Sequence, residues 1–204
     1  RVRGGDYIAR DYDIEPDVSA ACYFYALAAA TGKRAMVKRM RKESLQGDMK
    51  FISLLEKMGC TVSWERDGRQ NLWLKGPDGK LKGMEVKMSD FSDQALTLAA
   101  IAPFADSEVT IKGIAHIRGQ ESDRIKVIVD ELAKMGILCN ELPDGVKIHP
   151  GTPKNTNIET YNDHRVAMSF AVTGLAGDGM TILNPMCCKK TFAGFFDEID
   201  RLEE

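Results

Sequence analysis

The chain has 204 residues, of which 44% are hydrophobic and 28% charged, and its formal net charge is −2. This composition is typical of a globular protein, and the near-neutral charge argues against a dedicated nucleic-acid-binding protein, which would usually be basic. No apolar run approaches the ~20 residues that a membrane-spanning helix needs, so neither nucleic acid nor a membrane is an expected partner. Five cysteines at scattered spacings fit neither a disulfide framework nor a metal motif, and they favour a reducing cytoplasm.

Apolar periodicity and turn residues predict three similar runs of elements along the chain. The first run has a strand at 12–14, a helix at 19–31, a strand at 35–39, a helix at 47–58, and strands at 61–65 and 71–75. The second has a strand at 84–87, a helix at 91–105, a strand at 108–112, a helix at 122–135, and strands at 138–141 and 146–149. The third has a strand at 158–160, a helix at 162–175, a strand at 180–183 and a helix at 192–202. Because the third run lacks its two closing strands, we expect the chain to be part of something larger.

The three runs are evenly spaced. Acidic residues open the first helix of each run at Asp17, Asp93 and Asp163, which are 76 and 70 residues apart. The segment EKMG at 56–59 recurs as AKMG at 133–136. We interpret this as one supersecondary unit used three times, in a single α/β domain over residues 1–204 with quasi-threefold symmetry. The unit boundaries lie at about 12–82, 83–150 and 155–204. The first helices are apolar all round, so we expect them to be buried at the centre.

Charged clusters stand at the predicted helix starts: GQESDR at 119–124, YNDHR at 161–165 and KKT at 189–191. Each can be read as helix caps with solvated charges. However, a guanidinium at the start of an apolar helix must face solvent or an anion, and it suits carboxylate or phosphate. Lysines at a helix start oppose the helix dipole unless an anion lies between them and the helix amides. We therefore expect Arg124, Arg165 and Lys190 to meet at one anion-binding rim.

The same clusters resemble motifs of the enolpyruvyl transferases, in the same order along the chain. The matching segments are DVSAACYF at 17–24, SLQGD at 44–48, ESDR at 121–124, YNDHRVAM at 161–168 and KTF at 190–192. The resemblance covers essentially the whole chain and corresponds to roughly the C-terminal half of the two-domain enzymes of this family. It implies an inverse α/β barrel of three βαβαββ units, a monomeric parent enzyme, and an N-terminal domain as the partner of this chain.

The YNDHR segment most resembles the family member that transfers the enolpyruvyl group from phosphoenolpyruvate to the 5-hydroxyl of shikimate 3-phosphate, in aromatic amino acid biosynthesis. The resemblance implies addition and then elimination of phosphate, without a metal or organic cofactor. By position, Arg124 and Arg165 would hold the phosphoenolpyruvate carboxylate, and Lys190 would hold its phosphate.

The resemblance also implies roles for two acids and two departures from the family pattern. Asp93 would bind the shikimate hydroxyls and act as base, and Glu121 would move a proton at the enol methylene. Gln120 and His116 stand where a lysine and an asparagine are common, at positions that contact shikimate 3-phosphate. His116 can equally be read as a surface histidine. Arg124 is expected to lower the pKa of Glu121, which would weaken this group as an acid.

Other functions stay open from the sequence. One is the transferase that uses UDP-N-acetylglucosamine, which shares the fold but is disfavoured by YNDHR. A second is a non-catalytic module that binds anions, and a relative of RNA 3′-phosphate cyclase would need a nucleotide-binding signature that we do not find. Because the family site lies between two domains, we expect the isolated chain to be inactive.

Overall fold

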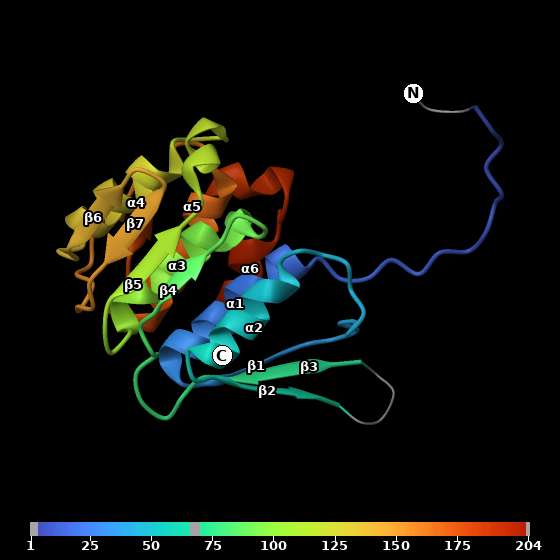
Figure 1. Cartoon of the computed structure of the whole chain (residues 1–204), viewed down its shortest axis with the longest axis horizontal. Helices are drawn as coiled ribbons and strands as arrows, with labels where there is room; N and C mark the ends of the chain where they lie inside the picture. Colours follow the sequence, from blue (N-terminus) through green and yellow to red (C-terminus); the bar gives the residue numbers. More distant parts are fainter. Residues whose placement is uncertain (1–3, 66–69, 203–204) are drawn as a thin grey trace.

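The computed structural model describes residues 4–65 and 70–202 (Figure 1). The segment before the first helix runs away from the body of the molecule, and the strand predicted at 12–14 is wrong. Tyr12 and Ile14 are 77% and 78% exposed. No strand of the described residues pairs with them, and an alternating pattern without a neighbouring strand cannot satisfy its backbone groups as a sheet. Asp13 instead pairs with the side chains of Arg39 and Arg41.

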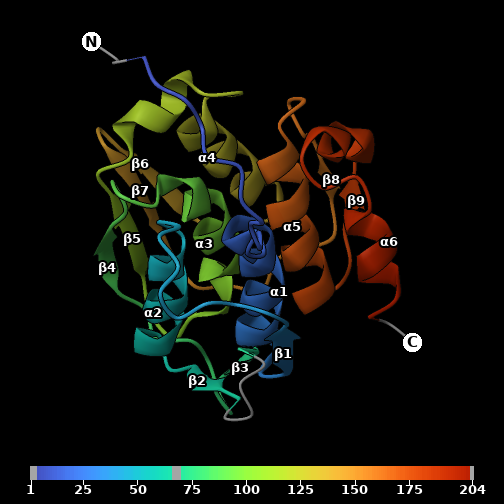
Figure 2. The same ribbon diagram turned by 90° about the vertical axis from the view of Figure 1, so that its right-hand side faces the viewer.

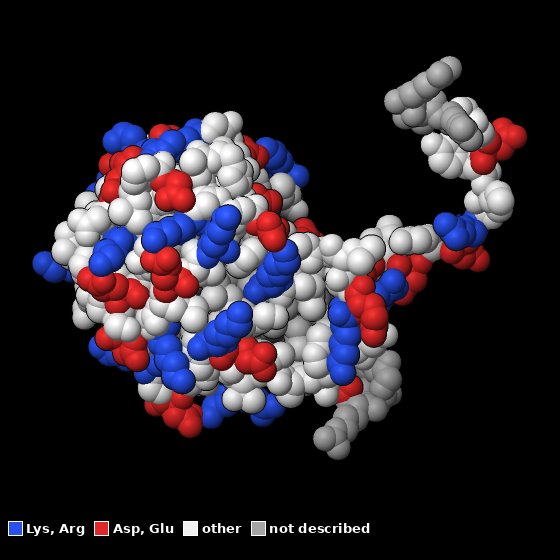
Figure 3. Space-filling view, in the orientation of Figure 1, with Lys and Arg blue, Asp and Glu red and all other residues white. Residues whose placement is uncertain are grey.

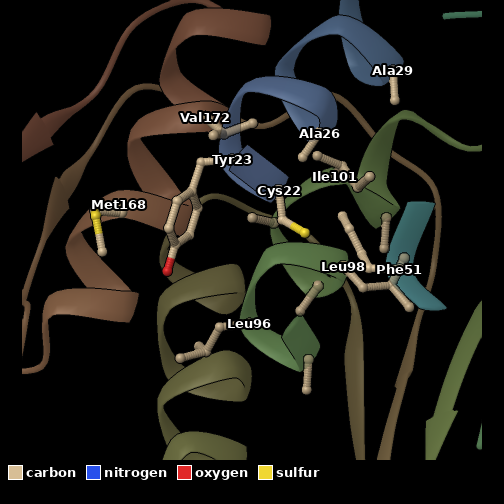
Figure 4. Close-up of a cluster of buried hydrophobic side chains, with 14 of the residues drawn as sticks. Cys22, Tyr23, Ala26, Ala29, Phe51, Leu96, Leu98, Ile101, Met168 and Val172 are labelled. Atoms are coloured by element: carbon tan, nitrogen blue, oxygen red, sulfur yellow. The ribbon is translucent and has the colours of Figure 1, made fainter. Parts of the chain in front are cut away.

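Three helices form the centre of the molecule: α1 (Val18–Thr31), α3 (Ala95–Ile101) and α5 (His164–Ala176). They pack against one another and lie side by side in Figure 2, which confirms the predicted burial of the apolar helices. Small alanine side chains allow this close approach, and larger side chains fill the remaining space between the helices (Figure 4). Asp17 caps α1 by accepting a hydrogen bond from the Ser19 amide at 2.8 Å, and Gly32 ends the helix with a φ of 69°.

The helix predicted at 91–105 is divided into three parts. A 3₁₀ turn at Ser92–Gln94 precedes α3, and another at Ala102–Phe104 follows it. Pro103 has no amide to donate, so it interrupts the α-helical ladder. In the turn before Pro103, the Ala100 carbonyl accepts a hydrogen bond from the Thr173 hydroxyl of α5 at 2.8 Å.

The other helices lie outside this centre: α2 (Met49–Lys57), α4 (Arg124–Lys134) and the short α6 (Phe195–Asp200). In α4 the buried Ile125, Ile128 and Leu132 lie on one side, as the helical spacing predicted. Two 3₁₀ segments were not predicted, η3 (Ala115–Gly119) and η4 (Pro185–Lys190). None of the helices among the described residues combines the length and the apolar character required to cross a membrane.

The strands form three small sheets around the central helices. The first holds β1 (Arg34–Val37), β3 (Leu72–Lys75) and β2 (Thr61–Trp64), all antiparallel and in that order. The second has the order β4 (Glu85–Lys87), β5 (Val109–Lys112), β7 (Gly145–Ile148) and β6 (Cys139–Leu142), with only β4–β5 parallel. The third pairs β8 (Asn157–Ile158) with β9 (Thr181–Ile182) in parallel. The first two runs therefore pair their last three strands in the same order, as expected for related units.

Contacts between side chains show that the starts of the three central helices come together. Asp48, just before α2, accepts hydrogen bonds from Ser19 at the start of α1 and, at 2.7 Å, from Gln94 before α3. Arg165 in the first turn of α5 contacts Asp93, the neighbour of Gln94, at 2.8 Å. The charged clusters of the sequence thus lie at one end of the helical centre.

Candidate functional site

Arg124 lies at the middle of the charged cluster. It is the first residue of α4 and only 2% exposed, an unusual degree of burial for an arginine. Its Nε donates to Asp163 at 2.8 Å, and one terminal nitrogen donates to Glu121 at 2.9 Å. The other terminal nitrogen donates to Gln120 and lies 3.6 Å from Asp93. The guanidinium is therefore held in one orientation from several sides.

Asp163 is the buried partner of this arginine and also the N-cap of α5. Its side chain is fully buried, and its carboxylate accepts from the Arg165 amide at 2.9 Å and from the Ser122 hydroxyl at 3.0 Å. Burial alone would raise the pKa of Asp163, but the hydrogen bonds and charge of Arg124 outweigh burial and hold this pKa below its usual value. Asp163 therefore joins two elements, α4 and α5, through a charged contact.

Arg165 projects from the first turn of α5 toward a carboxylate. Its guanidinium donates to Asp93 at 2.8 Å, and its side chain is 14% exposed. Burial disfavours the charged guanidinium, but nearby Tyr23, Asp93 and Asp48 more than offset this, and the pKa of Arg165 is raised. Asp93 itself is 41% exposed, so the two arginines converge on a carboxylate that is open to solvent.

Glu121 and Lys190 form the outer part of the cluster. Lys190 Nζ lies 3.2 Å from Glu121 Oε1, and its side chain is 62% exposed. The pKa of Glu121 is lowered, chiefly by its own backbone amide and then by Lys190 and Arg124. The direction agrees with the prediction from the sequence, but the main cause is the backbone rather than Arg124.

The predicted position of Lys190 at a helix start is wrong. Lys189 and Lys190 end the 3₁₀ segment η4, which begins at Pro185, and α6 starts only at Phe195. Lysines at the C-terminal end of a helical segment interact favourably with the carbonyl dipoles, so no bound anion is needed to explain them there. The pairing with Glu121, not the helix dipole, connects Lys190 to the cluster.

The two residues that depart from the family pattern both lie at the cluster. Gln120 accepts a hydrogen bond from Arg124 through its side-chain oxygen. His116, in η3, is exposed, and its Nε2 lies 2.8 Å from the hydroxyl of Ser92, next to Asp93. A surface pocket of about 410 Å³ lies beside this turn. Its lining is largely polar: Ser19, Gln46, Gly47, Asp48, Ser89, Asp90, Phe91, Ser92 and Asp93.

Sequence reasoning gave two acids a smaller part than they have. Asp163 was expected only as a cap, yet it is the main partner of Arg124. Asp48 was not among the predicted site residues, and its side chain makes no capping bond to α2 but joins α1 to α3. An aspartate directly before a helix is a general cap signal, so the sequence could not distinguish these long-range contacts from local ones.

The cluster contains three cations and three carboxylates: Arg124, Arg165, Lys190, Asp93, Glu121 and Asp163. Their formal charges cancel, so an anionic ligand would compete with internal carboxylates for the guanidiniums. Lysines and arginines are also interspersed with acids over the face shown in Figure 3. In the part of the chain that the structure describes, no group of three His, Cys, Asp or Glu side chains is placed to hold a metal ion. A larger cavity of about 590 Å³, against α1 and β1, lies away from these charges and is lined mainly by apolar side chains.

Comparison with known proteins identifies the family of this chain. The family model described as EPSP synthase (3-phosphoshikimate 1-carboxyvinyltransferase) matches residues 1–199. The 3-phosphoshikimate 1-carboxyvinyltransferase of Nostoc punctiforme is 46% identical over 201 residues, which are 98% of this chain and 46% of that protein. A second such enzyme, from Halalkalibacterium halodurans, is 43% identical over 198 residues, covering 96% of this chain and 44% of that protein.

A solved structure shows the same fold. The EPSP synthase of Acinetobacter baumannii superposes with a TM-score of 0.82 and 28% identity over 97% of this chain and 48% of that one. The chain thus spans about half the length of the relatives that it matches. Because the family model covers almost the entire chain, this mixed α/β chain belongs to the EPSP synthase family.

Proposed function

We propose that this chain is the C-terminal half of an enzyme that transfers the enolpyruvyl group of phosphoenolpyruvate to the 5-hydroxyl of shikimate 3-phosphate. The observation that carries the proposal is the convergence of Arg124 and Arg165 on the exposed carboxylate of Asp93. Two guanidiniums aimed at one carboxylate form a site that can exchange this carboxylate for that of a ligand. Family membership supplies the identity of the ligand.

The architecture of the complete enzyme is part of the proposal. Residues 1–204 would form one domain of three units, at about 12–82, 83–150 and 155–204, in an inverse α/β barrel. The shared strand order of the first two runs and the mutual packing of α1, α3 and α5 support this arrangement. The remaining half of the protein would close over the cluster and complete the substrate contacts.

In the proposed reaction, Arg124 and Arg165 bind the phosphoenolpyruvate carboxylate, and Lys190 binds its phosphate. Asp93 is thereby released from Arg165 and can accept the proton of the 5-hydroxyl, whose oxygen forms a bond to C2 of the enolpyruvyl group. Glu121 delivers a proton to C3 and later removes one, while the C2–O bond to phosphate breaks. Each such proton transfer can contribute about 10²–10⁴-fold to the rate. Gln120 and His116 would contact shikimate 3-phosphate.

This assignment requires Glu121 to carry a proton, although its pKa is lowered in the free cluster. We propose that the negative charges of phosphoenolpyruvate offset Lys190 and Arg124 and raise the pKa of Glu121 only in the complex. A ¹³C NMR titration of the Glu121 carboxyl with and without phosphoenolpyruvate tests this. An unchanged pKa in the complex would contradict the acid role of Glu121.

The activity itself is tested by phosphate release from phosphoenolpyruvate and shikimate 3-phosphate. The chain is assayed alone and mixed with the N-terminal half of the Nostoc punctiforme enzyme, and the two halves of that enzyme serve as the positive control. We expect turnover only in mixtures, and its loss on Arg165→Gln but not on Arg39→Gln, a change at an exposed arginine that also pairs with a carboxylate. Turnover with UDP-N-acetylglucosamine as acceptor would favour the alternative transferase. Binding of phosphoenolpyruvate without turnover, while the positive control is active, would favour a non-catalytic module.

A further inference from the structure

The turn that precedes Asp163 has a backbone that most residues avoid. Tyr161 and Asn162 have φ angles of 52° and 56°, both in the left-handed region. The Asp163 amide donates to the Thr160 carbonyl at 2.8 Å, so residues 160–163 form a tight turn with two left-handed central residues. Asparagine tolerates this conformation, but for a tyrosine it is uncommon, so surrounding contacts must hold it.

A buried carboxylate of α4 supplies these contacts. Glu131 is fully buried, and it accepts from the Tyr161 hydroxyl at 2.8 Å and from the Glu159 amide at 3.3 Å. Lys134 balances its charge with two contacts of 2.7 and 2.9 Å. Burial, and then the Glu131 carboxylate, raise the pKa of Tyr161, so the hydroxyl keeps its proton and donates. Glu131 and Tyr161 together are termed the clasp below.

The clasp and the site use the same side of one helix. Glu131 follows Arg124 by seven residues, which is about two turns of an α-helix, so the two side chains leave α4 in nearly the same direction. Arg124 contacts Asp163, and Glu131 contacts Tyr161 two residues earlier. One rigid helix therefore holds the 160–163 turn at two points. Arg165 is the second residue of α5, which begins directly after this turn. The direction of its side chain therefore depends on how the turn is fixed.

A buried carboxylate such as Glu131, paired with the partly exposed Lys134, is a poor means of stability alone, since apolar side chains of similar size often stabilise as well or better. Hydrogen bonds, in contrast, fix direction. We propose that the clasp is a positioning device, in which Glu131 and Tyr161 hold the Asp163–Arg165 segment so that Arg165 and Arg124 address the same anion. In this proposal the two clasp residues act through the 163–165 segment and not by contact with the anion. The inference rests on the proposed function and adds two positioning residues to the site.

The test is Tyr161→Phe, with Tyr25→Phe as the matched control. Tyr25 is fully buried, whereas Tyr161 is 37% exposed, but both hydroxyls donate to an oxygen of another element. The Tyr25 hydroxyl donates to the Leu72 carbonyl at 3.1 Å, away from the cluster. In the mixture with the Nostoc punctiforme half, we expect Tyr161→Phe to raise KM for phosphoenolpyruvate about tenfold, which corresponds to ~1.4 kcal/mol. KM for shikimate 3-phosphate and the KM values of the control stay within about twofold, since a hydrogen bond far from the ligand does not alter its binding.

A second pair of variants separates positioning from folding. Glu131→Gln keeps an oxygen that can accept from Tyr161, whereas Glu131→Leu does not, so the glutamine variant is expected to retain the lower KM for phosphoenolpyruvate. Loss of thermal stability without any change of that KM in Tyr161→Phe would overturn the inference.

If the unmodified mixture shows no turnover, the proposed function fails, but the clasp remains testable. The ¹H–¹⁵N signals of the Arg124 and Arg165 Nε groups then report geometry directly. They are expected to shift in Tyr161→Phe and not in Tyr25→Phe. Identical arginine spectra in both variants would show that the clasp does not position these side chains.

Discussion

Two buried aspartates near helix starts, Asp48 and Asp163, are used in different ways. Asp48 is 8% exposed and accepts from the neutral Ser19 hydroxyl and Gln94 amide, which link α1 to α3. Asp163 is fully buried and accepts from the charged Arg124 as well as from Ser122 and the α5 backbone. The first aspartate joins elements through neutral partners, whereas the second also fixes a guanidinium.

The difference shows what makes a polar cluster capable of binding an anion. Neutral donors satisfy Asp48, and none of them carries a charge that could attract an anion. Arginine has five N–H groups in a rigid plane, so Arg124 can satisfy Asp163 and still present donors to Glu121 and Gln120. A carboxylate partner therefore fixes the orientation of the arginine without using all of its N–H donors. The comparison predicts that equal substitutions in the two regions have unequal consequences.

The largest expected effect is that of Arg124→Met. Among the described residues, Arg124 is the only cationic side chain within 3 Å of the fully buried Asp163 carboxylate. Removal of such a partner typically costs about 3–5 kcal/mol of unfolding free energy. Urea denaturation measures this loss, and phosphoenolpyruvate binding should be lost with it. Arg124→Lys is the control, because it keeps the positive charge but not the planar guanidinium. Its free energy of unfolding should lie between those of Arg124→Met and the unmodified chain. Equal stability of Arg124→Met and the unmodified chain would show that the pair contributes nothing.

The second prediction applies one substitution to both regions. Asp163→Asn puts an amide against donors of Arg124 and the α5 backbone, and loss of hydrogen bonds to a charged partner costs about 2–3 kcal/mol. Asp48→Asn keeps an oxygen for Gln94, and the Ser19 hydroxyl can rotate, so about 1 kcal/mol or less is expected. Urea denaturation of both variants measures the difference, and equal losses would refute the distinction between the two aspartates.

Local signals of the sequence predicted much of the fold. Apolar periodicity located α1, α4 and α5 to within two residues at their starts and within one residue at their ends, because each buries a continuous stripe or is buried all round. The convergence of Arg124 and Arg165 followed from comparing equivalent helix starts. The strand at 12–14 failed because a strand needs a neighbour, which no local pattern supplies. The start of η4 could have been predicted, since proline is common at the first position of a helical segment and Pro185 occupies that position.

Long-range pairing was the part that could not be predicted. Asp163 and Arg124 are 39 residues apart, and Tyr161 and Glu131 are 30 apart. A sequence shows which residue can cap a helix, but the partner of a buried carboxylate depends on how two helices pack. The roles proposed for Asp93, Glu121, Gln120 and His116 likewise remain predictions that only substrate experiments test.

The third prediction concerns pH. Burial, followed by the charge of Arg165, lowers the pKa of His164 below its usual 6.5, so the folded state holds this ring neutral. Its contribution to stability is complete above pH 6.5 and is lost as the pH falls through the lower folded pKa. The midpoint of urea unfolding should therefore decrease as the pH falls below about 6.5. His164→Gln should remove this decrease, whereas His149→Gln, at a partly exposed position directly after β7, should retain it. A slope that persists in His164→Gln would assign the pH dependence to other groups.

The smallest effect on stability is expected for Lys190→Met, and its value lies in separating stability from binding. Lys190 is 62% exposed, and its contact with Glu121 is of the kind that contributes about 0–1 kcal/mol. Thermal unfolding should hardly change, unlike that of Arg124→Met. Binding of phosphoenolpyruvate should nevertheless weaken and become less sensitive to salt, because salt screens the attraction between an exposed ammonium and an anion.

The matched control is Lys126→Met, since Lys126 is 66% exposed and also pairs with an acid, Asp130. If both lysine variants bind phosphoenolpyruvate equally well, the pairing of Lys190 with Glu121 is only a surface ion pair. A selective loss in Lys190→Met would instead show that the anion site extends from buried Arg124 to this exposed lysine, although the two contribute very differently to stability.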